Sequence, residues 1–174
     1  TIRNSLYVLS LQLRSDWAYY FKSKESFGEA LLDSYFESYR VRLEALLNVE
    51  HMTGAERLMN YWQRWLETQS SDDVDSKCLV VKLGGEVSDL SEAMRQALQR
   101  GTDMIIRRLA ECIEDGCADG SLAKSMDADE TALVLYNLWL GATVLTKIRR
   151  DRSALEAAMS ITRQLLKPTL GGVH

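Results

Sequence analysis

The feature that most constrains the fold is a helical periodicity that runs through almost the whole chain. Apolar side chains recur at intervals of three and four residues, in segments that begin at helix-capping residues. The 174 residues include one proline and ten glycines, too few for the many turns of a β-sandwich or β-barrel. Residues 78–83 could form a short buried strand, but no second strand is available to pair with it, which favours a buried helix. The sequence therefore predicts an all-α fold.

Capping motifs predict where the main helices begin and end. A hydroxyl or carboxylate side chain that precedes an apolar periodic run satisfies the free amides of the first helical turn. The expected starts are Ser23, Thr53 (with Glu56 as a capping box), Asp89, Asp127 and Ser153. The helices are expected to end near Glu50, at Gly116 and Gly120, and at Pro168. The apolar face of the first long helix is expected to contain Phe27, Leu31, Ser34 or Tyr35, Ser38 and Leu46.

Residues 132–146 are apolar around the whole circumference of their helix rather than along one stripe. A helix at the centre of a single bundle would have this pattern. Alternatively, one side faces the chain's own core and the other faces a second copy. We favour this dimer because the final helix also carries an apolar stripe with small residues. The residues expected at the dimer interface are Leu140, Thr143, Val144, Leu155, Ala158, Ile161, Thr162 and Leu165.

Composition argues against several classes of protein. Three cysteines form an odd number without a CxxC pair, which argues against a disulfide scaffold and for a reducing compartment. The start of the chain lacks the pattern of a signal peptide, and the most apolar segment is shorter than the roughly 20 residues of a bilayer span. We expect a soluble cytoplasmic protein that does not associate with membranes.

Residues with catalytic chemistry are scarce. His51 and His174 are the only histidines, so neither a Ser-His-Asp nor a Cys-His arrangement can be assembled with confidence. Cys112 and Cys117 have no histidine nearby, which makes a zinc site improbable, and no phosphate-binding loop is present. We expect no enzymatic activity, no metal site and no cofactor.

Charge is distributed unevenly along the chain. Residues 1–24 contain four basic side chains and one acidic side chain, a net charge of +3. The whole chain carries −4, so the remaining residues carry −7. A basic end on an acidic body suits a nucleic-acid-binding head, although scattered basic residues are also common on ordinary surfaces.

A short motif lies at the end of this basic segment. Residues 19–25 read Tyr-Tyr-Phe-Lys-Ser-Lys-Glu, and they closely resemble the junction between the recognition helix and the fourth helix of TetR-family transcriptional repressors. The resemblance implies that residues 15–20 form a recognition helix in the major groove. It also places Lys24 at a helix N-terminus, where it would favour a DNA phosphate. The implied DNA-binding residues are Arg14, Ser15, Trp17, Tyr19, Tyr20, Lys22 and Lys24.

The body extends the resemblance. Residues 78–95 and 136–142 are similar to the ligand-binding domain of TetR regulators of the NemR (N-ethylmaleimide-responsive) group. The implied architecture is a partial helix-turn-helix head, residues 1–25, on an effector-binding and dimerisation domain, residues 26–174. The implied function is a repressor that binds palindromic operator DNA as a homodimer and is released by a small-molecule effector. The effector pocket is expected to contain Trp62, Trp65, Cys78, Val81, Met104, Tyr136 and Trp139.

The NemR-like resemblance makes an electrophile or an oxidant the sharpest hypothesis for the effector. Cys78 is the candidate sensor because it begins the matching segment, and Lys77 and Lys82 could favour its thiolate. A buried, inert cysteine is the alternative interpretation.

The head departs from the family pattern in two ways. A three-helix head needs roughly 40–45 residues, whereas only 22 precede Ser23. We expect either a truncated sequence or one that joins pieces of the chain across missing loops. The abrupt start of the match at Arg14 favours the second. In addition, Asp16 is unfavourable near phosphates unless it caps the recognition helix. The competing hypothesis is therefore a helical homodimer that binds a small molecule or a protein without binding DNA.

Overall fold

The computed structural model describes residues 2–70, 80–82 and 91–167, and for residues 2–23 and Ser70 it describes the backbone only. The described residues form long helices and contain no strand, so the predicted all-α fold is confirmed. Residues 80–82 are also helical. The long helices are α1 (Ile2–Leu47), α2 (Gly54–Ser70), α4 (Glu92–Asp119), α5 (Ala128–Arg149) and α6 (Ser153–Leu165).

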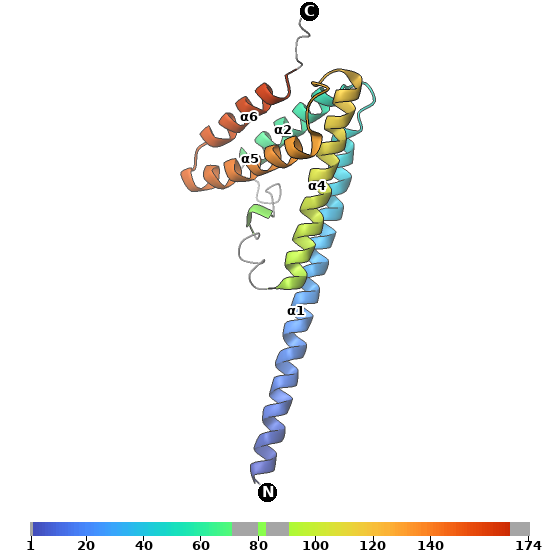
Figure 1. The fold of residues 1–174 in the computed structure, drawn as a ribbon. Helices are drawn as coiled ribbons and strands as arrows, with labels where there is room; N and C mark the ends of the chain where they lie inside the picture. Colours follow the sequence, from blue (N-terminus) through green and yellow to red (C-terminus); the bar gives the residue numbers. More distant parts are fainter. Residues whose placement is uncertain (1, 71–79, 83–90, 168–174) are drawn as a thin grey trace, which may run out of the picture.

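The helices form an elongated body with a projecting arm (Figure 1). α1 and α4 lie side by side along the long direction of the molecule, and α2, α5 and α6 lie together near the end at which α1 finishes. α4 contacts α1, α2 and α5, and α6 packs on α5 and α2. The N-terminal half of α1 extends beyond this body.

α1 continues through the position where the sequence predicted a new helix. The expected helix start at Ser23 is wrong, because one helix runs from Ile2 to Leu47. The segment contains no proline and its first glycine is Gly28, so nothing in the backbone chemistry forces a break at Ser23. The expected end near Glu50 is close to the observed end at Leu47.

The buried face of α1 also differs from the predicted one. Leu32, Phe36, Leu43 and Leu47 are buried, whereas Phe27 and Leu31 are 70% and 57% exposed. The sequence offers apolar residues in adjacent pairs, such as Leu31 and Leu32, so periodicity alone permits two neighbouring faces. Packing against α4 selects the second of them.

Two of the predicted caps are confirmed. At the start of α2, the Thr53 amide donates to Glu56 Oε2 at 2.8 Å, and the Glu56 amide donates to Thr53 Oγ1 at 3.3 Å. At the start of α5, the Glu130 amide donates to Asp127 Oδ1 at 2.9 Å. Both caps satisfy amides that lack partners within the helix.

Three predicted boundaries are corrected. α4 begins at Glu92 with Ser91 as its cap, and Asp89 lies outside the described residues. This helix runs through Gly116 and ends at Gly120, whose φ of 82° lies in the left-handed region that glycine adopts without strain. α6 begins at Ser153, but Asp151 supplies the cap by accepting from the Ser153 amide at 2.9 Å. The predicted stop at Pro168 lies outside the described residues.

Glycines allow the closest helix contacts. A Cβ atom on Gly101 of α4 would overlap the ring of Phe36 on α1. A Cβ atom on Gly54, at the start of α2, would overlap the backbone of Gly116 on α4. Helix α4 therefore lies against α1 and α2 at positions where only a hydrogen atom fits.

Helix α5 is long and apolar enough to cross a membrane by length and composition alone. Its inner residues Ala132, Leu135, Tyr136, Trp139, Ala142 and Thr143 are buried in the core of the protein. This burial accounts for one side of the all-round apolar pattern.

Candidate effector site, dimer face and DNA-binding segment

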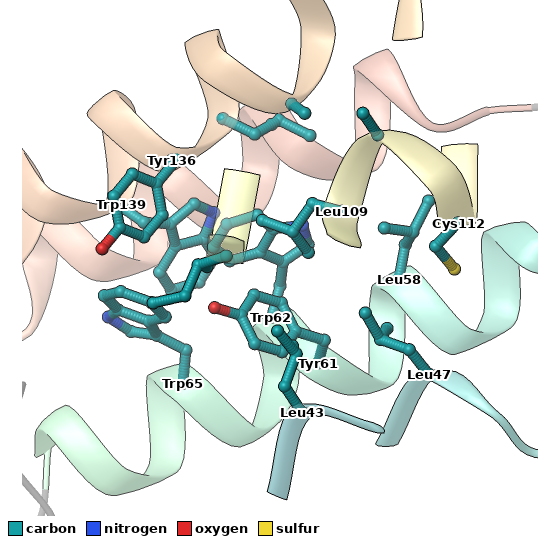
Figure 2. Packing of buried hydrophobic residues seen from close by; sticks show 14 of the residues in the cluster. Leu43, Leu47, Leu58, Tyr61, Trp62, Trp65, Leu109, Cys112, Tyr136 and Trp139 are labelled. Atoms are coloured by element: carbon teal, nitrogen blue, oxygen red, sulfur yellow. The ribbon is translucent and has the colours of Figure 1, made fainter. Parts of the chain in front are cut away.

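Aromatic side chains from α2 and α5 form the centre of the body (Figure 2). The rings of Trp62 and Trp139 stack with their centroids 5.1 Å apart and an interplanar angle of 12°. Trp65 meets Tyr136 edge to face at 6.0 Å, and Tyr61 meets Trp62 in the same way at 4.6 Å. We call this set, Tyr61, Trp62, Trp65, Tyr136 and Trp139, the aromatic cluster.

Two threonines bind the indole N–H groups of the cluster. Trp65 Nε1 donates to Thr143 Oγ1 at 3.0 Å, and Trp139 Nε1 donates to Thr162 Oγ1 at 2.9 Å. Each threonine hydroxyl then donates to a carbonyl four residues earlier in its own helix. These bonds link α2 to α5 and α5 to α6 through buried polar groups.

The third indole of the aromatic cluster, that of Trp62, differs from the other two in its hydrogen bonding. Trp62 is fully buried, and its Nε1 has no hydrogen-bond partner among the described residues. A buried donor without an acceptor is uncommon in folded proteins and is costly unless a ligand or water satisfies it. The Trp62 N–H is therefore a buried donor whose hydrogen bond is not made by the residues that the structure describes.

The predicted pocket residues divide into three groups. Trp62, Trp65, Tyr136 and Trp139 are buried together in the aromatic cluster. Val81 and Met104 are half-buried and pack against the same core. Cys78 lies outside the described residues.

The predicted dimer residues are only partly on the surface. Val144, Ile161 and Leu165 are 41–43% exposed, and Leu140 is half-buried. Thr143, Leu155, Ala158 and Thr162 are buried within the chain, so the prediction that they face a partner is corrected. The apolar stripe of α6 has a core side and a surface side, and the sequence interpretation combined them.

The segment expected to contact DNA lies on the projecting part of α1. The backbone of Arg14, Ser15, Trp17, Tyr19, Tyr20 and Lys22 is helical, and their side chains are outside the description. Lys24 is exposed. It lies inside α1 rather than at a helix N-terminus, so the expected contribution of a helix end to phosphate binding is wrong here.

Comparison with known proteins decides the family. A family model described as the tetracyclin repressor-like C-terminal domain matches residues 54–162. The HTH-type transcriptional repressor NemR of Escherichia coli K12 is 35% identical over 153 residues, which cover 88% of this chain and 77% of the relative. The chain belongs to the TetR family of transcriptional regulators.

Other comparisons agree with this family. The HTH-type transcriptional repressor DhaR of Mycobacterium sp. strain GP1 is 28% identical over 150 residues, which cover 86% of this chain and 74% of the relative. The crystal structure of reduced E. coli NemR superposes with a TM-score of 0.79 at 37% identity, covering 90% of this chain and 81% of that one. The resemblance inferred from residues 19–25 and from the body is therefore confirmed.

Two arginines of this TetR-family body hold the C-terminal end of α1. Arg57 Nη1 donates to the Leu47 carbonyl at 2.7 Å and forms an ion pair with Asp115 at 3.1 Å. Arg108 forms an ion pair with Glu44 at 3.1 Å and donates to Asn48. Arg108 also donates to the Leu47 carbonyl, at 3.5 Å, and the two arginine side chains are only 13% and 12% exposed, so both contact this last carbonyl of α1 in a partly buried setting.

Sequence analysis missed this arginine pair and the two threonines of the aromatic cluster. Thr143 does carry a signal, because it lies one turn after Trp139 on a helix that is otherwise apolar. The arginines had no comparable signal, since their partners lie on other helices.

The two cysteines within the described residues are poor nucleophiles. Burial raises the pKa of Cys112 to about 11, against a smaller opposite effect from Arg57 and Arg108. Burial also raises the pKa of Cys117, with Asp119 and Glu114 acting in the same direction. At neutral pH both remain thiols, whereas the thiolate is the reactive form.

Proposed function

We propose that the chain is a transcriptional repressor that binds a palindromic operator as a homodimer and releases it when a small-molecule effector binds in the body. The observation that carries this proposal is the 35% identity to a named repressor over 88% of the chain. We further propose that it acts in the cytoplasm, where bacterial operators are found.

The aromatic cluster is the proposed effector site. Its rings offer a large apolar surface, and the Trp62 N–H offers one hydrogen-bond donor, a combination typical of small-molecule sites. A flat molecule with a carbonyl or other acceptor group would fit this chemistry. To release DNA, the effector must bind the released conformation more tightly than the DNA-bound conformation.

We propose Cys78 as the sensor if the effector is an electrophile. The raised pKa values of Cys112 and Cys117 support this choice, because they leave those two thiols unreactive at neutral pH. Lys77 and Lys82, its neighbours in sequence, would favour the thiolate of Cys78.

A gel-shift experiment tests the repressor. The probe is the DNA upstream of the protein's own gene, with the complete natural protein at low salt. We expect a retarded band that weakens steeply as the salt concentration rises, since phosphate contacts dominate the affinity. A complete dimeric protein that causes no shift at low salt would contradict the proposal and favour a helical module that does not bind DNA.

Replacement of the cysteines tests the sensor. We expect N-ethylmaleimide to release the DNA from the native protein and from the Cys117→Ser variant, but not from Cys78→Ser. If Cys78→Ser releases DNA as readily as the native protein, covalent sensing at Cys78 is wrong, and the effector binds without a covalent bond.

A further inference from the structure

A hydrogen bond between two tyrosines connects the aromatic cluster to α1. The hydroxyl oxygens of Tyr39 on α1 and Tyr61 on α2 lie 2.8 Å apart, and either hydroxyl can be the donor. Tyr61 is buried, and Tyr39 is half-buried. Loss of one hydroxyl would leave the other without this partner in a setting that is partly closed to water. The bond therefore joins the proposed effector site to the helix that carries the expected DNA-binding segment.

Tyr61 packs directly against two indoles of the cluster. Its ring meets Trp62 edge to face at 4.6 Å, and its centroid lies 6.0 Å from that of Trp65 (Figure 2). Protein interiors are packed as closely as organic crystals, so a molecule that enters between these rings must displace some of them. Because the Tyr61 hydroxyl is bonded to Tyr39, a displacement of the Tyr61 ring acts on α1.

The ring of Tyr39 is held by neighbours on its own helix. The Tyr35 ring lies 6.1 Å from it between centroids, and the Arg42 guanidinium lies 5.6 Å from its centroid, a cation–π contact. These contacts come from α1 itself and restrict rotation of the Tyr39 side chain. A displacement of its hydroxyl is therefore passed to the backbone of α1.

α1 can carry such a displacement to its projecting end. It is one helix from Ile2 to Leu47, and the arginine pair holds it at Leu47. From Leu47, Tyr39 lies about 12 Å along the helix axis and Lys22 about 38 Å, at a rise of 1.5 Å per residue. A tilt of α1 about this held end, together with the part of α4 packed on it, thus moves Lys22 about three times as far as Tyr39. Helix shifts of about 1–2 Å are a common switching movement.

We propose that Tyr39 and Tyr61 are positioning residues that couple the effector site to the DNA-binding segment. A molecule in the aromatic cluster displaces Tyr61, and the hydrogen bond to Tyr39 passes the displacement to α1. This inference rests on the proposed function and names the contact through which that function is regulated. Coupling is reciprocal, so DNA bound to α1 must also change the surroundings of the cluster. One hydrogen bond accounts for a roughly two- to tenfold change in affinity.

Fluorine NMR of the complete natural protein, labelled with 5-fluorotryptophan, tests the reciprocal effect without an effector. A displaced Tyr61 ring changes the ring current at Trp62, whose resonance is assigned with Trp62→Phe. We expect the DNA fragment of the gel shift, at saturation, to move this resonance in the native protein. Tyr39→Phe and Tyr61→Phe should each reduce the movement at least about twofold. The double variant should reduce it no further, because either change removes the same bond.

Tyr35→Phe is the matched control, because it removes a hydroxyl from α1 one turn before Tyr39 and should keep the native movement. Urea denaturation of each variant separates coupling from stability. A loss of stability in Tyr39→Phe with an unchanged movement would overturn the proposal and leave a purely structural bond. An equal loss of movement in Tyr35→Phe, or no movement in native protein that binds the DNA, would also overturn it. These results leave the repressor intact, whereas absence of a gel shift would contradict the proposed function itself.

Discussion

At the scale of single residues, the buried threonine hydroxyls accept hydrogen bonds from tryptophans on neighbouring helices. Thr162 Oγ1 accepts a hydrogen bond from Trp139 Nε1, and both side chains are fully buried. Both groups are inaccessible to water, so neither can exchange its partner for solvent.

Replacing Thr162 should therefore be costly. Thr162→Val keeps the shape but removes the acceptor, and we expect the free energy of unfolding to fall by about 1–3 kcal/mol because the Trp139 N–H is left unpaired. Urea denaturation measures the change. Thr162→Ser retains the hydroxyl and should lose less, and equal losses in the two variants would contradict the role of the hydrogen bond.

Cys112 should make the stability depend on pH in alkaline solution. Burial raises its pKa from 9.0 to about 11, so the unfolded chain loses this proton first. The stabilisation is complete below about pH 9 and is lost as the pH rises toward 11. We expect the difference in unfolding free energy between the native protein and Cys112→Ala to shrink over this interval. A difference that stays constant with pH would contradict the raised pKa.

At the scale of helices, the contact between α1 and α4 depends on one glycine. Gly101→Ala improves the intrinsic helix propensity of α4 but places a Cβ atom into the ring of Phe36. We expect a net loss of about 1–3 kcal/mol, the usual cost of overpacking, by thermal or urea unfolding. Combining it with Phe36→Leu should recover part of the loss. Additive losses would show that the two residues do not clash.

Local chemistry explains which features of the helices were predictable. The caps at Thr53 and Asp127 involve side chains and amides three residues apart, so the sequence contains both partners. The buried face of α1 depends on α4, a helix more than forty residues away in the sequence, and the adjacent pairs Leu31/Leu32 and Leu46/Leu47 made two faces equally apolar. The continuation of α1 through Ser23 had no local signal either.

The same distinction, between contacts that are local in sequence and contacts between distant helices, applies to the candidate sites. The burial of four candidate pocket residues in one cluster was predictable, because large aromatic residues on the apolar stripes of α2 and α5 meet in the core. The hydroxyl partner of Trp139 was not predicted, since the sequence analysis assigned Thr162 to the dimer interface. For the proposed dimer face, the pattern of α5 predicted two apolar sides, but periodicity did not separate the buried residues of α6 from the exposed ones.

At the scale of the whole molecule, a charge on the exposed apolar side of α5 should separate the subunits of the proposed homodimer. Val144 is 41% exposed in the single chain, so Val144→Glu should leave the helical content unchanged. We expect the dimer dissociation constant to rise at least about tenfold, because a buried unpaired charge costs more than 1.4 kcal/mol. Sedimentation equilibrium measures this constant, with Ser38→Glu on α1 as the control. Unchanged association would mean that this face is not an interface.

Helix α5 lies between the proposed effector site and the proposed dimer face, so the thickness of one helix separates them. Trp139 belongs to the aromatic cluster on one side of α5, and Gly141 and Val144 lie on the other side. In the proposed repressor, an effector that shifts α5 would change the self-association of the chain, and self-association would change the affinity for that effector by the same factor. Under the proposed function, the apparent affinity for the effector would depend on the concentration of the protein, so the abundance of the regulator would influence its own response.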